Sequence, residues 1–326
     1  MPEIFNALPG IEVPVDDIGR GLTRMWESTA ARGVAAPEAD DVTATQVNLV
    51  LHLGLACEAA DAQTQFETAV RFSQRYPSRV VVLCPLLVDH EGMEIRAKVY
   101  GECFLGKSKA DKRCVEFVML SYSRAARPHL ESQVSICLSS DLPLYYWAHR
   151  FSASGKLADY RYLLGRARRV LVDSAIAPAD ALTYPWTNPA SLRDLAYSRL
   201  LPVRQTIGQF LARYEPARLT DGLATVTVAH GEELAAEARV THGWLRRRLL
   251  ECGSVDAVHW KAERAAPGVL GVRFEYVDGK KYFRWQGDLG TKHAHFEADF
   301  GSGPVRLPAA VGLLTPEQAL SEAMFF

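Results

Sequence analysis

Long apolar runs alternate with helical periodicity in the first half of the chain. Thr45–Leu55 is rich in large apolar residues and Val80–Cys84 is entirely apolar, which predicts buried strands. Between them, apolar residues recur every three or four positions over Ala60–Arg75, and Pro77 ends this predicted helix. Two buried strands joined by a helix predict a βαβ unit with a parallel sheet.

The same patterns extend this sheet. The predicted strands are Ile95–Phe104, Ser132–Leu138, the aromatic segment 144–151 and Arg169–Ser174, and the predicted helices are Cys114–Ala126 and Leu157–Arg166. Ahead of the first strand, Val15–Glu27 is predicted as a short amphipathic helix of an N-terminal adaptor segment.

The pattern changes in the second half. Residues 190–215 and Glu232–Glu251 have helical periodicity, with a short strand at Thr225–Ala229 between them. The predicted strands that follow are Ala257–Glu263, Val269–Val277, Lys281–Gln286 and His293–Phe300, with an Asp278-Gly279 hairpin turn and a terminal helix that begins at Thr315-Pro316. The predicted fold class is therefore α/β, with an open, mostly parallel sheet domain followed by an α+β region with a C-terminal antiparallel meander. The predicted divisions are an N-terminal adaptor segment (1–43), an α/β domain (44–185) and an α+β domain (186–326).

Composition excludes several classes of protein. The chain has 326 residues, enough for two domains, and a formal net charge of −1, which gives no electrostatic reason to bind nucleic acid. No apolar run approaches the roughly 20 residues that span a bilayer, so no membrane partner is predicted. The N-terminus lacks a basic region followed by an apolar core, so we expect a cytoplasmic protein.

The cysteines do not form a metal motif. The six cysteines are scattered and include no CxxC pair, so no metal site is predicted and reduced, buried thiols are expected. Cys103 and Cys114 are the closest pair, and we keep a redox switch there as a hypothesis, although spacing alone does not establish their proximity.

One segment resembles a nucleotide-binding loop. Gly101–Ser108 fits the pattern GxxxxGK[ST], but a phosphate-binding loop also needs a buried strand before it and a helix that starts at the lysine. Arg96 and Lys98 interrupt the preceding strand, and Asp111-Lys112-Arg113 is a poor first helical turn. We expect instead a loop that contacts a partner, with phosphate binding as the alternative.

Three polar residues are candidates for a small-ligand site. Asp173 and Ser174 close a predicted strand, and Asp141 follows another, which is where ligands bind in parallel sheets. Helix capping explains the same residues equally simply. No GxSxG, HExxH or paired-carboxylate motif accompanies them, so no catalytic residue is assigned.

Six segments, taken in order, resemble the OpcA family of glucose-6-phosphate dehydrogenase assembly proteins over about residues 11–250. They are Thr45–Val50, Arg75–Val82, Ser139–Trp147, Val170–Ser174, Asp194–Arg204 and Gly243–Leu245. Tyr197 and Val203 stand where the family pattern has tryptophan.

The resemblance implies a non-catalytic protein without a cofactor that binds glucose-6-phosphate dehydrogenase, activates it allosterically and so regulates the oxidative pentose phosphate pathway. Arginines beside aromatic residues are typical of interface anchors, although a solvated, salt-bridged face is the alternative. The predicted partner contacts are Tyr145, Tyr146, Trp147, Arg193, Tyr197, Arg199, Arg204, Lys107 and Arg113. The alternative function is an α/β enzyme or sensor that binds a sugar phosphate or nucleotide.

Overall fold

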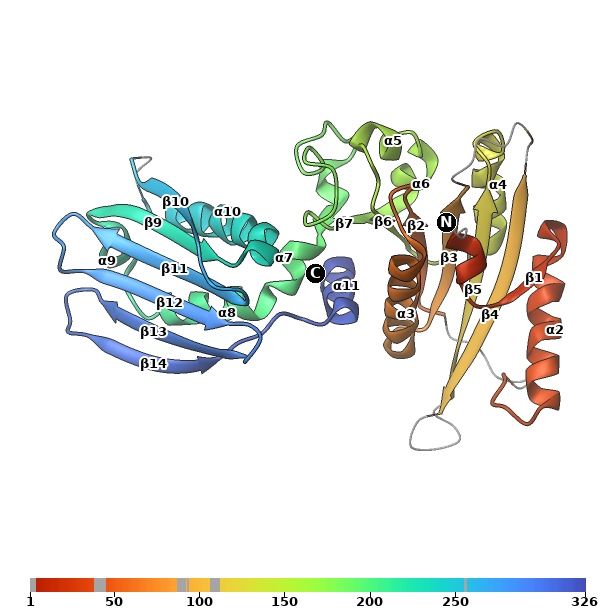
Figure 1. Ribbon diagram of the computed structural model, residues 1–326, viewed down its shortest axis with the longest axis horizontal. Helices are drawn as coiled ribbons and strands as arrows, with labels where there is room; N and C mark the ends of the chain where they lie inside the picture. Colours follow the sequence, from red (N-terminus) through yellow and green to blue (C-terminus); the bar gives the residue numbers. More distant parts are fainter. Residues whose placement is uncertain (1–3, 38–44, 87–91, 93, 106–111, 255–256) are drawn as a thin grey trace. The chain divides into compact units, whose positions relative to one another are not determined.

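The computed structural model describes residues 4–37, 45–86, 92, 94–105, 112–254 and 257–326 (Figure 1). It divides into two compact units. The first comprises residues 1–194 and 320–326, and the second comprises residues 195–319. Among the described residues, no helix is both long enough and apolar enough to cross a membrane.

The first unit is built on an eight-stranded sheet in the order β1-β4-β5-β3-β2-β6-β7-β8. Its strands are β1 (Ile11–Val13), β2 (Val47–Leu53), β3 (Ser78–Pro85), β4 (Ile95–Leu105), β5 (Lys112–Tyr122), β6 (Leu144–His149), β7 (Ala167–Val172) and β8 (Leu192–Asp194). The pairings from β5 through β3, β2, β6 and β7 to β8 are parallel, whereas β4 is antiparallel to β5 and to β1. The predicted mostly parallel sheet is confirmed.

Helices connect these strands. They are α1 (Ile4–Ala7), η1 (Val15–Asp17), α2 (Ile18–Ala31), α3 (Ala59–Arg75), α4 (Arg127–Cys137), α5 (Ser154–Ala158), α6 (Arg161–Arg166) and η2 (Pro189–Ser191). Every residue of β2 and of β6 is buried, as expected for strands covered on both faces.

Two predictions in this unit are wrong. The segment predicted as a helix, Cys114–Ala126, is mostly strand β5, because its apolar run pairs along its whole length with β4. The predicted strand Ser132–Leu138 lies in helix α4, where Leu130, Val134 and Cys137 are buried at helical spacing.

The N-terminal segment is part of the first unit. Strand β1 pairs with β4 at the edge of the sheet, and Met25 and Trp26 of α2 pack against Gly101. A β-carbon at Gly101 would collide with both side chains, so this glycine permits close packing of a helix on a strand. The observed division between the units falls at Asp194.

The second unit packs helices on a six-stranded sheet in the order β10-β9-β11-β12-β13-β14. Its elements are α7 (Leu195–Arg199), α8 (Leu201–Leu211), α9 (Pro216–Thr220), β9 (Leu223–His230), η3 (Glu232–Leu234), α10 (Ala235–Glu251), β10 (His259–Arg264), β11 (Val269–Tyr276), β12 (Tyr282–Asp288), β13 (His293–Asp299) and β14 (Val305–Ala310). The terminal helix α11 (Pro316–Phe325) belongs to the first unit from Leu320 onward. Strands β11 to β13 confirm three strands of the predicted antiparallel meander, and β14, which was not predicted, extends it. The predicted first strand of the meander, β10, is instead parallel to β9. Apolar side chains of α8 and α10 share one core with the sheet.

Candidate functional site

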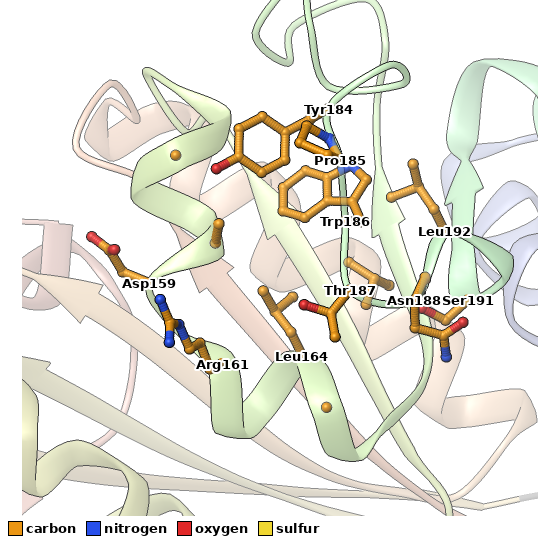
Figure 2. Close-up of a pocket in the computed structure, with 14 residues that line it drawn as sticks. Asp159, Arg161, Leu164, Tyr184, Pro185, Trp186, Thr187, Asn188, Ser191 and Leu192 are labelled. Atoms are coloured by element: carbon orange, nitrogen blue, oxygen red, sulfur yellow. Dashed lines mark hydrogen bonds between the residues drawn. The ribbon is translucent and has the colours of Figure 1, made fainter.

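A groove of about 590 Å³ lies beside β7 and β8 in the first unit (Figure 2). One wall comes from α5 and α6, and the other comes from the loop that leads into β8. The side chains that define it are Asp159, Arg161, Leu164, Tyr184, Trp186 and Leu192.

Hydrogen bonds hold the two aromatic rings of this groove in place. The indole Nε1 of Trp186 donates to the carbonyl oxygen of Ala181 at 2.8 Å, and the backbone N–H of Tyr184 donates to that of Asp180 at 2.7 Å. The rings of Tyr184 and Trp186 lie side by side in Figure 2, with 4.6 Å between their centroids. Both side chains are half-buried, so each still offers surface to a partner. Rings fixed in this way lose little conformational entropy on binding.

The lining of this groove suits binding better than proton transfer. Its titratable side chains are Asp159, Arg161 and Tyr184. These three residues do not form the pair of a proton donor and a proton acceptor that general acid–base catalysis requires. Leu164 and Leu192 supply apolar surface, and Asn188 at the mouth adds a polar rim. An aromatic centre with a polar rim is typical of a protein interface.

Arg193 lies directly beside this groove, in β8. Its Nη1 donates to the carbonyl oxygens of Ala190 at 2.9 Å and Leu192 at 2.8 Å. Burial and the neighbouring Arg169 lower the pKa of Arg193. Arg193 stays a predicted partner contact.

The predicted aromatic contacts in β6 do not reach the surface. Tyr145, Tyr146 and Trp147 are each at most 3% exposed. The ring of Tyr145 packs against Phe325, and the hydroxyl of Tyr146 bonds to His52. Because β6 is a central strand covered on both faces, these residues belong to the core, and we do not propose them as direct contacts.

The other predicted aromatic–arginine pair lies in the second unit. Arg204 of α8 stacks on the ring of Tyr197 in α7, and both side chains are partly exposed. Arg199 instead pairs with the buried carboxylate of Glu237 at 2.6 Å. Tyr197 and Arg204 stay predicted contacts, whereas Arg199 has a structural role in the unit.

The segment that resembles a phosphate-binding loop has the wrong context. Gly101 lies within strand β4, and the chain re-enters the sheet as β5 at Lys112, where a phosphate-binding loop would continue as a helix. Lys107 lies outside the described residues. Arg113 is exposed in β5, and its Nη1 donates to the carbonyl oxygen of Gln74 at 3.3 Å.

The cysteines Cys103 and Cys114 are brought together by the β4–β5 pairing. They stand directly opposite each other, with 4.0 Å between their α-carbons, and they form a disulfide. Redox control of activity stays a prediction.

The three predicted ligand residues do not form one site. Asp141 precedes β6 and therefore lies at the amino end of that strand, because the segment before it is a helix and not the predicted strand. Asp173 follows β7 at the carboxyl end, where its side chain accepts from the backbone N–H of Ala175. The backbone N–H and the Oγ of Ser174 donate to Asp194 at 3.0 and 2.8 Å. These contacts form turns that connect strands.

Sequence patterns missed a compact polar cluster at the ends of β2 and β6. Among the described residues, the ligand atoms of Cys57, Asp61 and His149 lie within 4.8 Å of one another. Burial raises the pKa of Cys57 to about 12 and lowers that of His149. Although burial opposes its ionisation, hydrogen bonds from His149, Gln65 and Arg150 hold the pKa of Asp61 low. A protonated thiol and a guanidinium on the shared carboxylate disfavour a bound cation.

Fold and site together define a two-unit α/β protein with an aromatic groove in its first unit. Residues 69–184 match the family described as the glucose-6-phosphate dehydrogenase subunit N-terminal domain. A Synechocystis protein assigned by name to the OxPP cycle, OpcA, is 24% identical over 179 residues, which are 53% of this chain and 37% of that protein. This match and this relative confirm, over the matched residues, the resemblance to the OpcA family seen in the sequence. The chain covers little more than a third of that relative's length.

Two solved structures align at low similarity. One is a dipicolinate-bound dihydrodipicolinate reductase from Paenisporosarcina sp. TG-14, with 10% identity over 86% of this chain and 92% of that chain and a TM-score of 0.39. The other is an aldose–aldose oxidoreductase from Caulobacter crescentus complexed with glycerol, with 11% identity over 86% and 87% and a TM-score of 0.37. TM-scores this low support no argument about activity.

Proposed function

We propose that this chain is a non-catalytic assembly factor and allosteric activator that binds glucose-6-phosphate dehydrogenase. The observation that carries the proposal is the match of residues 69–184 to a family described as a domain of that dehydrogenase's subunit. Through this partner, the chain regulates entry into the oxidative pentose phosphate pathway, and it acts in the cytoplasm.

The contact surface we propose in the first unit is the groove that holds Tyr184 and Trp186. Tryptophan, tyrosine and arginine are the residues most often found at the energetic centre of an interface. Trp186 is held by its bond to Ala181, Arg161 lines the same groove, and Arg193 directly follows Leu192 of its lining. In the second unit we propose the Tyr197–Arg204 pair as a contact.

Activation then follows from differential binding. A protein that binds the active conformation of an enzyme more tightly than the inactive one shifts the population toward the active form. A difference of about 1.4 kcal/mol between the two binding free energies shifts their ratio tenfold. No catalytic group of this chain needs to enter the dehydrogenase active site.

Co-purification tests the proposal. Tagged chain is mixed with the dehydrogenase of the same organism, and the complex is isolated by size-exclusion chromatography with light scattering. We expect a complex whose mass equals the sum of both proteins. If the two elute separately at micromolar concentrations, the proposed function is wrong.

A further inference from the structure

A second cavity in the first unit lies at the carboxyl ends of the parallel strands. It has a volume of about 470 Å³ and is lined by residues that follow or end β2, β3, β5 and β6. Its apolar walls come from Leu53, Pro85, Leu86 and Phe151. None of the predicted contacts or ligand residues lines it.

The sheet topology places this cavity where parallel sheets bind ligands. From β2 the chain passes through α3 to β3 on one side, and from β6 it passes through α5 and α6 to β7 on the other side. Strands β2 and β6 are neighbours, so the connections diverge between them and leave a crevice at their carboxyl ends.

The cavity carries an excess of positive charge. Its ionised side chains are Arg124, Arg127 and Lys156 on one hand and Asp159 on the other, so three cations face one carboxylate. Arg127 pairs with Asp159 at 3.0 Å and stacks on the ring of Tyr160, with 4.3 Å from Cζ to the ring centroid. These contacts fix the guanidinium at the wall, while Arg124 and Lys156 are exposed at the rim.

A chain of hydrogen bonds leads from the core to the same wall. The hydroxyl of Tyr146 bonds to Nδ1 of His52, and Nε2 of His52 lies 2.6 Å from the hydroxyl of Tyr122. The hydroxyl of Tyr122 lies 2.7 Å from that of Tyr160. His52 is fully buried and its pKa is lowered to about 3, so its ring is neutral and has one donor and one acceptor nitrogen.

The burial of Tyr146 determines which group donates and which accepts in each of these hydrogen bonds. Tyr146 is 0% exposed, and within the described part of the protein its hydroxyl bonds only to His52, so its proton goes to Nδ1. Nε2 of His52 then donates to Tyr122, and Tyr122 donates to Tyr160. The opposite direction would bury the phenol proton of Tyr146 without an acceptor. The O–H of Tyr160 is therefore left to donate into the cavity, and burial raises its pKa and keeps it protonated.

We propose that this cavity is a binding site for a small organic phosphate. Arg127 and the O–H of Tyr160 bind phosphate oxygens at the wall, Arg124 and Lys156 neutralise the dianion at the rim, and the apolar walls hold the organic part. Arginine presents a planar fork of donors that matches phosphate oxygens. The cavity volume exceeds that of the phosphate group alone, which is why we infer a phosphate ester and not the free ion.

The probes for this site are ribose 5-phosphate, inorganic phosphate and uncharged ribose, each titrated into the whole chain by calorimetry and thermal denaturation. We expect saturable binding of ribose 5-phosphate, weaker binding of inorganic phosphate and none of ribose. Binding should weaken as ionic strength rises, because the rim charges are exposed to solvent. If neither phosphate compound binds at millimolar concentrations, or ribose binds as tightly as its phosphate, the inference is wrong.

Substitutions locate the site. Arg124→Gln combined with Lys156→Gln removes two exposed charges without disturbing the core, and Tyr160→Phe removes one hydroxyl while keeping the ring under Arg127. We expect each variant to weaken ribose 5-phosphate binding about tenfold or more, since each removes a charge-assisted or directed hydrogen bond. The matched control is Arg168→Gln, an exposed arginine of β7 outside the cavity.

Unchanged affinity in both variants, or an equal loss in Arg168→Gln, would assign the binding to another part of the surface and overturn the proposal. The measurement needs no dehydrogenase. A negative result for phosphate binding is therefore distinguishable from a negative result for the proposed function, which is tested by complex formation without added phosphate ester.

Discussion

The guanidinium of Arg204 lies over the ring of Tyr197, with 3.6 Å between Cζ and the ring centroid. Its Nη2 also donates to the carbonyl oxygen of Tyr197 at 3.2 Å. These two contacts hold an aromatic ring and a positive charge together where α7 meets α8. Arginine and tyrosine are common at the energetic centres of interfaces, and this fixed pair stays our predicted contact in the second unit.

Arg204→Glu should weaken the stimulation of glucose-6-phosphate dehydrogenase while leaving the second unit folded. The substitution removes a cation–π contact of about 0.5–2 kcal/mol and reverses the charge offered to the partner. We expect the concentration of chain that gives half-maximal stimulation to rise about tenfold. Kinetic titration measures the effect, and circular dichroism checks the fold.

The matched control is Arg247→Glu, a reversal of an exposed charge on α10. It should leave the titration unchanged. Full stimulation by Arg204→Glu would remove the α7–α8 surface from the proposed interface.

The Arg199–Glu237 pair should contribute to stability and not directly to partner binding. Side chains of the two residues are 17% and 5% exposed, so Glu237→Gln removes a carboxylate charge that faces the Arg199 guanidinium in a largely desolvated setting. We expect a loss of about 3 kcal/mol in the free energy of unfolding, measured by urea denaturation. The exposed pair Arg248–Glu251 provides the control, and Glu251→Gln should cost about 0.5 kcal/mol or less. Equal losses in the free energy of unfolding from the two substitutions would show that burial does not strengthen the Arg199–Glu237 pair.

Trp186→Ala should weaken dehydrogenase binding by at least about 2 kcal/mol, or roughly 30-fold in the dissociation constant. The reason is that Trp186 is the largest side chain of the groove and is already fixed by its bond to Ala181. Surface plasmon resonance with immobilised dehydrogenase measures the change. Leu182→Ala alters an exposed apolar residue of the same loop that does not line the groove, and it should have no effect. Wild-type affinity in Trp186→Ala would exclude the groove as the contact.

His52 should make the first unit less stable at acid pH. Burial, with a smaller contribution from Arg127, lowers the pKa of His52 to about 3 in the folded protein, whereas it is about 6.5 in an unfolded chain. Between these values the unfolded state binds more protons, so the free energy of unfolding falls as the pH drops through this window. The fall is at most about 1.4 kcal/mol per pH unit for this one group.

The site-specific measurement is a titration of the His52 ring by nuclear magnetic resonance. We expect its signals to stay at the neutral position down to about pH 5, while the stability measured by urea denaturation declines from about pH 6.5. A midpoint near the ordinary value for histidine would contradict the hydrogen-bond chain through Tyr146 and Tyr122.

Most of the fold could be predicted because buried strands and helices differ in their apolar periodicity. The predicted segments match β2, α3 and β3 closely, and the Asp278-Gly279 turn joins two strands of the meander. The failures lie where local pattern is ambiguous. The apolar residues of strand β5 also fit helical periodicity, and its pairing with β3 and β4 decides its structure.

The candidate sites were harder to predict, because they depend on which strand ends become neighbours. The sequence suggested Tyr197 as an anchor, but Tyr145 to Trp147 look equally suitable until β6 is placed at the centre of the sheet. His52 and Tyr160 are far apart in the chain and meet only through the order of the strands.

Above all, we propose that this chain binds glucose-6-phosphate dehydrogenase and raises its activity. The most direct measurement is the initial rate of the purified dehydrogenase from the same organism, titrated with this chain at fixed substrate concentrations. We predict a saturable increase in rate, with no turnover by the chain alone. A rate that stays constant across the titration, with the dehydrogenase confirmed as active, would contradict the account.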